Sequence, residues 1–296
     1  MSKLKAINPT TAPASKPKIM IYGKPGVGKT WGSMDFPNVF YIDTESGGDL
    51  PHYMAKLKNS GGGYFGVEQG SMNFNEVIGQ IQALATEKHE YKTVVIDSIS
   101  KIFAVAIADE AERLGDKNAF GADKKPAIQH MRKLVSWLSR IDMNVIITAH
   151  EKPMWGIDKK GERAEIGVTF DAWEKLEYEL HLVLNIFKAG PDHKARVTKS
   201  RLAEFFVGDV FEWSYAEFSK RYGKIVMEAA PTQIVLPSAD QLQEIKRLVE
   251  LVNLPEKTVE KWLKSANAES WDEMDAPKLQ KCIEFIHATI IKGETK

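Results

Sequence analysis

A glycine-rich loop that follows a short apolar run is the feature that most constrains this chain. The run Lys18–Tyr22 predicts a buried strand, and the residues from Thr30 onward can begin a helix. Between them lies Gly23-Lys24-Pro25-Gly26-Val27-Gly28-Lys29-Thr30, which fits the pattern of Gly, four residues, Gly-Lys and then Ser or Thr. Glycines let backbone N–H groups turn toward a phosphate, and a helix N-terminus attracts negative charge. The order of strand, loop and helix therefore predicts a nucleotide-binding site rather than a flexible glycine loop.

The residue types in this loop predict how ATP and Mg²⁺ are held. Lys29 is expected to reach the β- and γ-phosphates, and the Thr30 hydroxyl is expected to bind Mg²⁺. The predicted nucleotide contacts cover the loop and the first residues of the helix: Gly23, Lys24, Pro25, Gly26, Val27, Gly28, Lys29, Thr30 and Trp31.

Composition sets wide limits. The 296 residues are 43% hydrophobic and 27% charged, which is ordinary for a globular protein with a core. Forty basic and forty acidic residues give a net charge of zero, so any nucleic-acid binding must come from local patches. No apolar run approaches the length of a membrane span, and no secretory signal is visible. Cys282 is the only cysteine, which fits a cytoplasmic protein.

Short apolar runs alternate with helical patterns over the first half of the chain. The runs lie at 39–42, 93–96 and 144–148, and the helical patterns at 74–87, 99–114 and 127–141. Such alternation predicts an α/β fold with a mostly parallel sheet covered on both faces. Two β-like segments, Glu179–Lys188 and Lys194–Lys199, flank a turn and predict an antiparallel hairpin. Ligands of parallel sheets bind at the carboxyl ends of the strands, where five polar residues fall: Thr30, Asp43, Glu45, Asp97 and His150.

Four segments are predicted. An extended or disordered arm covers 1–15, an ATPase core 16–226, a proline-containing linker 227–238 and a small helical bundle 239–296. Ser238 and Gln241 predict a capping box at the start of the bundle. The slight acidic excess of the bundle favours a protein partner over DNA, although its apolar stripes are also explained by a core alone.

Two carboxylates are the candidates for metal binding and water activation. Asp97 ends an apolar strand and is expected to hold Mg²⁺, with a helix N-cap as the alternative. No acid directly follows Asp97, because Ser98 and Ile99 come next. Glu45, just past another strand, is the better candidate to position the attacking water, and a solvated acid in a glycine-rich turn is its alternative.

Three of these strands resemble those of RecA/RadA-type recombinases. Tyr41-Ile42-Asp43-Thr44-Glu45 is similar to the strand with their catalytic glutamate, and Val94-Val95-Ile96-Asp97-Ser98 to their metal-binding strand. Val145-Ile146-Ile147-Thr148-Ala149-His150 resembles the strand whose terminal polar residue, usually Gln, senses the γ-phosphate. More closely, residues 16–226 resemble the RecA-like P-loop ATPases of bacteriophages, which are known as nucleotide-binding or AAA-type proteins and linked to single-strand annealing and recombination.

The resemblance implies further roles. His150 would sense the γ-phosphate, although a hydrogen-bonded histidine at a strand end explains it equally. Lys199 and Arg201, which share a face if their segment is extended, would reach the γ-phosphate of a neighbouring subunit, and an exposed basic strand is the alternative. The loops Gly115–Lys125 and Lys152–Phe170 would contact single-stranded DNA; without the resemblance they read as solvated loops. Their basic and aromatic residues are Lys117, Phe120, Lys124 and Lys125 in the first loop, and Lys152, Trp155, Lys159, Lys160 and Arg163 in the second.

The sequence thus predicts a RecA-like P-loop ATPase with a C-terminal helical bundle. Its expected activity is Mg²⁺-dependent ATP hydrolysis coupled to assembly of a ring or filament on single-stranded DNA, in recombination or annealing. One alternative is a ring helicase or loader. Another is a nucleotide-switched adaptor whose bundle binds a partner such as a single-strand-binding protein.

Overall fold

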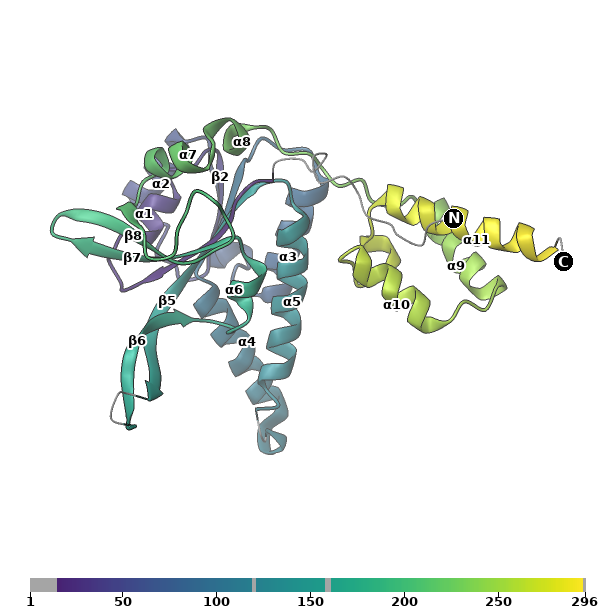
Figure 1. The fold of residues 1–296 in the computed structure, drawn as a ribbon, viewed down its shortest axis with the longest axis horizontal. Helices are drawn as coiled ribbons and strands as arrows, with labels where there is room; N and C mark the ends of the chain where they lie inside the picture. Colours follow the sequence, from purple (N-terminus) through teal and green to yellow (C-terminus); the bar gives the residue numbers. More distant parts are fainter. Residues whose placement is uncertain (1–14, 119–120, 158–160, 295–296) are drawn as a thin grey trace. The chain divides into compact units, whose positions relative to one another are not determined.

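The computed structural model describes residues 15–118, 121–157 and 161–294. Within these residues nine strands form one sheet in the order β3-β2-β4-β5-β1-β7-β8-β9, and β6 pairs with β5 (Figure 1). The strands are β1 (Lys18–Gly23), β2 (Val39–Asp43), β3 (Gly63–Phe65), β4 (Thr93–Asp97), β5 (Asn144–Ile157), β6 (Arg163–Asp171), β7 (Leu182–Ala189), β8 (Asp192–Ser200) and β9 (Val210–Glu212). The α-helices are α1 (Lys29–Ser33), α2 (Pro51–Asn59), α3 (Phe74–Thr86), α4 (Ile99–Leu114), α5 (Lys124–Arg140), α6 (Leu176–Glu179), α7 (Tyr215–Tyr222), α8 (Lys224–Glu228), α9 (Ala239–Leu251), α10 (Glu256–Ser265) and α11 (Ala276–Glu294).

The pairing of the strands confirms the predicted fold class. Strand β1 is parallel to β5 and β7, and β2, β3, β4 and β5 are parallel to their neighbours. Strands β7 and β8 form the predicted antiparallel hairpin. In register, Gly23 lies beside His150 and Asp43 beside Asp97, so the carboxyl ends of β1, β2 and β4 lie at one edge of the sheet, where β5 carries His150. Polar residues far apart in the sequence therefore meet at one edge of the sheet.

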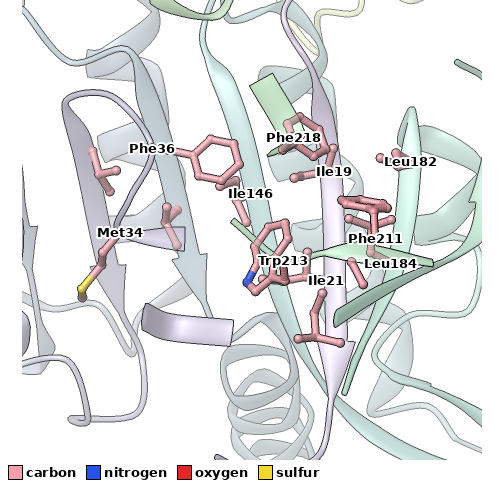
Figure 2. Packing of buried hydrophobic residues seen from close by; sticks show 14 of the residues in the cluster. Ile19, Ile21, Met34, Phe36, Ile146, Leu182, Leu184, Phe211, Trp213 and Phe218 are labelled. Atoms are coloured by element: carbon pink, nitrogen blue, oxygen red, sulfur yellow. The ribbon is translucent and has the colours of Figure 1, made fainter. Parts of the chain in front are cut away.

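The core over one face of the sheet is aromatic. Alternate residues of the central strands, such as Ile19 and Ile21, point to this face and are fully buried. Figure 2 shows Phe36, Trp213 and Phe218 packed over them. The ring of Phe36 lies 5.6 Å from that of Phe218 and 6.0 Å from that of Trp213, centroid to centroid. Burial of large aromatic side chains is a main source of stability, so this cluster fixes α1, α2, α7 and α8 on the strands that carry the polar residues.

One predicted loop is a hairpin. Residues 152–170 were expected to be a loop after a strand that ends at His150, but β5 continues to Ile157 and pairs with β6 in antiparallel register from His150–Asp171 onward. The hairpin projects beyond the rest of the sheet in Figure 1. Its ladder includes Pro153 and Gly156, two residue types that usually interrupt or weaken a strand. Proline is tolerated here because a two-stranded projection leaves one side of each strand unpaired.

The chain divides into two compact units. Of the residues that the structure describes, those within 1–69, 90–101 and 142–231 form the unit with the sheet, and those within 70–89, 102–141 and 232–296 form the other. In the second unit, Ser238 and Gln241 form the predicted capping box of α9, and buried Ile245, Leu279 and Ile286 lie in the core of the C-terminal helices. The boundaries predicted at 226 and 238 stay a prediction. Among the described helices, none combines the length and apolar character needed to cross a membrane.

Candidate active site

The loop between β1 and α1 is shaped by two glycines. Gly26 and Gly28 have φ angles of 73° and 90°, in the left-handed region that other residues rarely adopt. A Cβ atom on Gly28 would lie 2.7 Å from His193 Nδ1, whereas one on Gly26 would meet nothing within 4 Å. Gly28 is therefore required by backbone conformation and by space, and the loop at Gly26 is open.

Two side chains from the β8–β9 end of the sheet bind backbone carbonyl groups of this loop. His193 on β8 donates through Nδ1 to the Val27 carbonyl at 2.7 Å, and Trp213 donates through Nε1 to the Gly28 carbonyl at 3.3 Å. Sequence reasoning missed both residues, because 166 and 185 positions separate them from their partners and no local pattern marks them.

Lys29 lies folded against its own loop. Its Nζ donates to the carbonyl of Gly23 at 2.7 Å and to that of Lys24 at 3.0 Å. Burial lowers the pKa of the Lys29 amine, and the negative charges of Asp97, Glu45 and Glu151 act in the opposite direction. A single cation thus faces three carboxylates.

Asp97 gathers hydroxyl groups from three elements. Its buried carboxylate accepts from Thr30 Oγ1 at 2.6 Å and from Tyr41 Oη at 2.5 Å, both on Oδ2, and from Thr148 Oγ1 on Oδ1. Burial, and then the charge of Asp97, raises the pKa of the Tyr41 phenol, which keeps it a donor. At the start of α4, the backbone N–H of Lys101 donates to Ser98 Oγ at 3.3 Å. Ser98 thus makes the capping contact that was the alternative role for Asp97.

Glu45 is held by two side chains from neighbouring strand ends. His150 Nε2 donates to Glu45 Oε1 at 2.5 Å, and Ser98 Oγ donates to the same oxygen. About a third of the Glu45 side chain is exposed, so the carboxylate is accessible from solvent while it is fixed. The alternative of a merely solvated acid therefore does not describe Glu45.

The turn after β2 explains why Glu45 lies within reach of Ser98 and His150. The buried carboxylate of Asp43 accepts from the backbone N–H of Glu45 at 2.9 Å, from that of Gly48 at 2.7 Å and from Tyr64 Oη at 2.9 Å. Thr44 ties the turn to β4, because its N–H donates to the Asp97 carbonyl at 2.8 Å. The turn is thus set by buried hydrogen bonds rather than by its glycines alone.

These side chains line a cavity of about 410 Å³ at the carboxyl end of the sheet. The volume lies in the range of small-ligand pockets. The structure thus brings together the predicted residues Lys29, Thr30, Glu45, Asp97 and His150. The other lining residues are Gly23, Pro25, Gly26 and Glu151. Sequence reasoning missed Glu151, although an acid directly after the polar end of a strand was a usable signal.

Lys199, Arg201 and Trp31 do not line this cavity. Lys199 Nζ donates to the Leu180 carbonyl, and Arg201 Nη2 donates to the Tyr178 carbonyl, so both side chains reach one segment of their own chain. Burial and the charge of Arg201 lower the pKa of Lys199 to about 8. The ring of Trp31 is nearly half exposed and lies 3.7 Å from Lys56 Nζ, over a second, more open concavity that also includes His52.

Among the described basic residues of the predicted DNA loops, two have side-chain partners and three lie in helices. Lys152 forms an ion pair with Asp171 at 3.2 Å, and the Arg163 guanidinium lies 5.6 Å from the centre of the Trp155 ring. In the first predicted loop, Lys117 lies in a short 3-10 helix, and Lys124 and Lys125 begin α5, so that segment is only partly a loop. Phe120, Lys159, Lys160 and the arm 1–14 lie outside the described residues.

The residues present fit a magnesium-bound nucleotide. The loop offers an open cradle at Gly26, a lysine and a helix N-terminus beside it. Thr30 and Asp97 supply a hydroxyl and a carboxylate oxygen, which are ligands that Mg²⁺ prefers. The described residues contain no cluster of three or more His, Cys, Asp or Glu that could hold a metal by itself. Such a donor set fits Mg²⁺ held jointly by a few protein oxygens and substrate phosphates.

A family model and solved structures both match this chain. A family model described as "AAA domain" matches residues 15–208. A comparison with curated proteins found no match. Among solved structures, the chain is similar to the RadB recombinase, at 17% identity and a TM-score of 0.41 over 66% of this chain and 86% of that one. It is also similar to an ATPase from the type III secretion system of pathogenic bacteria, at 13% identity and a TM-score of 0.41 over 92% of this chain and 79% of that one.

Proposed function

The chain belongs to the AAA domain family, which makes it a nucleotide-binding ATPase, and we propose that it hydrolyses Mg²⁺-bound ATP as an oligomer on single-stranded DNA. The observation that carries the hydrolysis is the convergence of Lys29, Thr30, Asp97 and Glu45 on one cavity. From the resemblance of its strand motifs, we infer that this activity serves recombination or strand annealing of the phage type.

The hydrolysis follows from what these side chains can do. Mg²⁺, when bound, would neutralise charge on the β- and γ-phosphates. Thr30 and Asp97 would hold the metal through their adjacent oxygens. The Lys29 amine would exchange the two carbonyls of its loop for phosphate oxygens, which is a gain because a charged acceptor forms the stronger hydrogen bond.

Glu45 would orient the attacking water and accept its proton. Ser98 and His150 both donate to Oε1, and this fixes the direction of the carboxylate. A positioned base of this kind contributes about 10²- to 10⁴-fold to the rate. His150, at the cavity wall, would also sense whether a γ-phosphate is present.

Lys199 and Arg201 would act on a neighbouring subunit. Their side chains reach the same segment, and neither lines the cavity of its own chain. A cation from a neighbour would complete the charge stabilisation at the γ-phosphate and would make hydrolysis depend on assembly. The working form is then a ring or a filament.

The hairpin of β5 and β6 is the proposed DNA contact. Trp155 is more than half exposed, and Arg163 lies beside its ring. Bases of any sequence stack on such aromatic side chains, and basic residues contact the phosphates. Trp155→Ala should therefore weaken single-stranded DNA binding without changing ATP binding.

The proposal is tested by measuring ATP hydrolysis with and without single-stranded DNA, with Lys29→Ala as the blank. We expect turnover that DNA stimulates and that the variant lacks. A folded Lys29→Ala protein with normal turnover would exclude this site. A strand-displacement assay on the same preparation separates an annealing protein from a ring helicase.

One observation favours the adaptor function as a second candidate. Phe285 on α11 is more than half exposed, and its ring meets that of Trp262 on α10 edge-on at 5.6 Å. Exposed aromatic side chains such as Phe285 are common anchors for protein partners. If the chain is an adaptor, ATP hydrolysis does not respond to DNA. The Phe285→Ser variant then no longer binds a single-strand-binding protein but still turns over ATP.

A further inference from the structure

Two tyrosines near the cavity make the same diagonal step across the sheet. Tyr41 on β2 and Tyr64 on β3 are partners in register, and their rings stack at 6.3 Å, centroid to centroid, with 13° between the planes. Tyr41 Oη donates to Asp97 Oδ2 at 2.5 Å, and Tyr64 Oη donates to Asp43 Oδ2 at 2.9 Å. In each case the acid lies on the neighbouring strand, two residues beyond the register partner of the tyrosine. Two carboxylates at neighbouring strand ends are thus each bound by one phenol.

The first phenol is directed at the acid proposed to hold the metal. Tyr41 is almost completely buried, so its ring cannot turn away without disturbing the close-packed core. It shares Asp97 Oδ2 with the hydroxyl of Thr30, and the hydroxyl of Thr148 donates to the other oxygen of Asp97. Donors on both oxygens keep the carboxylate from rotating. Hydrogen-bond partners of this kind direct a metal-binding carboxylate toward its ion.

The second phenol is directed at the turn that carries Glu45. Besides the hydroxyl of Tyr64, Asp43 accepts from the backbone N–H groups of Glu45 and Gly48, at 2.9 and 2.7 Å. Partial burial, and then the hydrogen bond to Asp43, raise the pKa of the Tyr64 phenol, so this hydroxyl stays a donor. Tyr64 thus reaches the backbone of Glu45 through a single carboxylate.

Resting on the proposed function, we propose that the two tyrosines are positioning residues with separate tasks. Tyr41 holds Asp97 in the orientation that binds Mg²⁺. Tyr64 holds Asp43, and with it the turn that directs Glu45 at the attacking water. Neither tyrosine is among the residues that line the cavity, so each acts through its acid rather than on the substrate.

The loss of each hydroxyl has its own consequence. Without the hydroxyl of Tyr41, Asp97 keeps its charge but can rotate, so its affinity for the ion falls. The outer partners of metal ligands contribute about 10- to 100-fold to metal affinity, and we expect about tenfold here because Thr148 still donates to Asp97. Without the hydroxyl of Tyr64, the turn loosens while Asp97 is unchanged. The ion then binds normally, and hydrolysis slows by about tenfold, the size of one hydrogen bond to a charged group.

The experiment uses Tyr41→Phe and Tyr64→Phe, which each remove one hydroxyl and keep both rings. Binding of Mn²⁺, a paramagnetic substitute for Mg²⁺, is measured by electron paramagnetic resonance in the presence of a non-hydrolysable ATP analogue. The rate constant of single-turnover hydrolysis is measured at saturating Mg²⁺. We expect Tyr41→Phe to bind Mn²⁺ about tenfold more weakly and to approach the wild-type rate constant at saturating Mg²⁺. Tyr64→Phe should bind Mn²⁺ as the wild type does and hydrolyse ATP about tenfold more slowly.

Tyr215→Phe is the matched control. The hydroxyl of Tyr215 also donates to a carboxylate, that of Glu228, at 2.9 Å, and its ring packs against Phe36 in the core. Neither Tyr215 nor Glu228 is among the lining residues of the cavity. This variant undergoes the same chemical change as the other two, and it should bind Mn²⁺ and hydrolyse ATP as the wild type does.

The outcomes separate this inference from the proposed function. If Tyr41→Phe binds Mn²⁺ as tightly as the wild type, the role of Tyr41 is overturned while the ATP site stands. If Tyr64→Phe keeps the wild-type rate constant, or also binds Mn²⁺ weakly, the separation of tasks is overturned. Equal losses in Tyr215→Phe would assign the effects to general stability and overturn the whole inference. If the wild type neither binds the analogue with Mn²⁺ nor hydrolyses ATP, the proposed function falls and the inference with it.

Discussion

The two ends of the central strands both bury charged side chains, but they satisfy them in different ways. At the carboxyl ends, buried Asp97 and the more exposed Glu45 are bound by side chains and border a cavity. At the amino ends, the buried amines of Lys18 and Lys16 donate to backbone carbonyls, those of Met143 at 2.7 Å and Ala229 at 2.6 Å. Asn144 continues this pattern with bonds to the carbonyls of Lys92 and Met227.

The difference teaches which buried charges are available for chemistry. A backbone carbonyl inside the fold cannot leave, so Lys18 and Lys16 act as fixed ties between the sheet and the segments beside it. Side chains that bind one another at a cavity can exchange those partners for a ligand. Lys29 illustrates the second case, because its two carbonyl partners belong to an open loop. The predictions below test this contrast, beginning with the largest expected effect.

Asp97→Asn should remove most of the Mg²⁺-dependent turnover. The amide has nearly the same shape but loses the charge that holds the metal, and its NH2 group donates where the carboxylate accepted. The kcat should therefore fall by about 10³-fold, as expected when a metal contact worth several kcal/mol is lost. Steady-state hydrolysis over a range of Mg²⁺ concentrations measures this. Asp192→Asn, at the exposed start of β8, is the matched control. Equal turnover in the wild type and Asp97→Asn would assign the metal elsewhere.

Glu45→Gln should lower kcat by about 100-fold and leave nucleotide affinity unchanged, because only the proton acceptor is lost. Single-turnover hydrolysis together with calorimetry separates the two quantities. Glu68→Gln, an exposed acid of a short 3-10 helix, should behave as the wild type. A variant that loses affinity and keeps its rate constant would show that Glu45 binds substrate instead.

Lys18 should make stability rise with pH. Burial lowers the pKa of its amine from 10.5 to about 7 in the folded chain. Between these values the unfolded chain holds more protons, so the free energy of unfolding increases as pH rises from 7 toward 10.5. Relative to Lys18→Met, the wild type should gain on the order of 2 kcal/mol between about pH 7 and 9. Urea denaturation at several pH values measures this gain, with exposed Lys58→Met as the control. Parallel pH profiles for the wild type and Lys18→Met would contradict a lowered pKa.

Ser98→Ala should have the smallest effect. It removes one of the two donors to Glu45 and leaves His150, so kcat should fall by about tenfold with an unchanged KM, the size of one hydrogen bond to a charged group. The pH dependence of kcat gives a second readout, since a carboxylate that loses a donor becomes more basic. Ser139→Ala on the exposed face of α5 provides the comparison. An unchanged rate and pH profile would leave His150 as the residue that positions Glu45.

The strand ends could be predicted because they follow from local patterns. Continuous apolar runs such as Thr93–Ile96 lie where predicted, and the rule that ligands bind at the carboxyl ends places Asp97 and Glu45 at one edge. The partners of Asp97 could not be predicted in the same way. Tyr41 and Thr148 reach it because β4 lies between β2 and β5, and this strand order is not encoded near any of the three residues.

The hairpin of β5 and β6 shows a second limit. Local signals such as Pro153 and Gly156 favoured a loop, but pairing between adjacent segments decided the structure. That error also hid Glu151, because the strand was expected to stop one residue before it. The contacts of His193 and Trp213 behind the phosphate loop depend on β8 and β9, which lie more than 160 positions away from it.

The most direct test of the contrast makes one substitution at each end of the sheet. Calorimetry with Mg²⁺ and a non-hydrolysable ATP analogue should be run on Lys29→Met and Lys18→Met beside the wild type. The account predicts that Lys18→Met binds the analogue as the wild type does, and that Lys29→Met loses at least about tenfold in affinity, as expected for the loss of a charge-assisted contact to phosphate. Equal binding by Lys29→Met and the wild type would contradict the assignment of the carboxyl-end cavity as the ATP site.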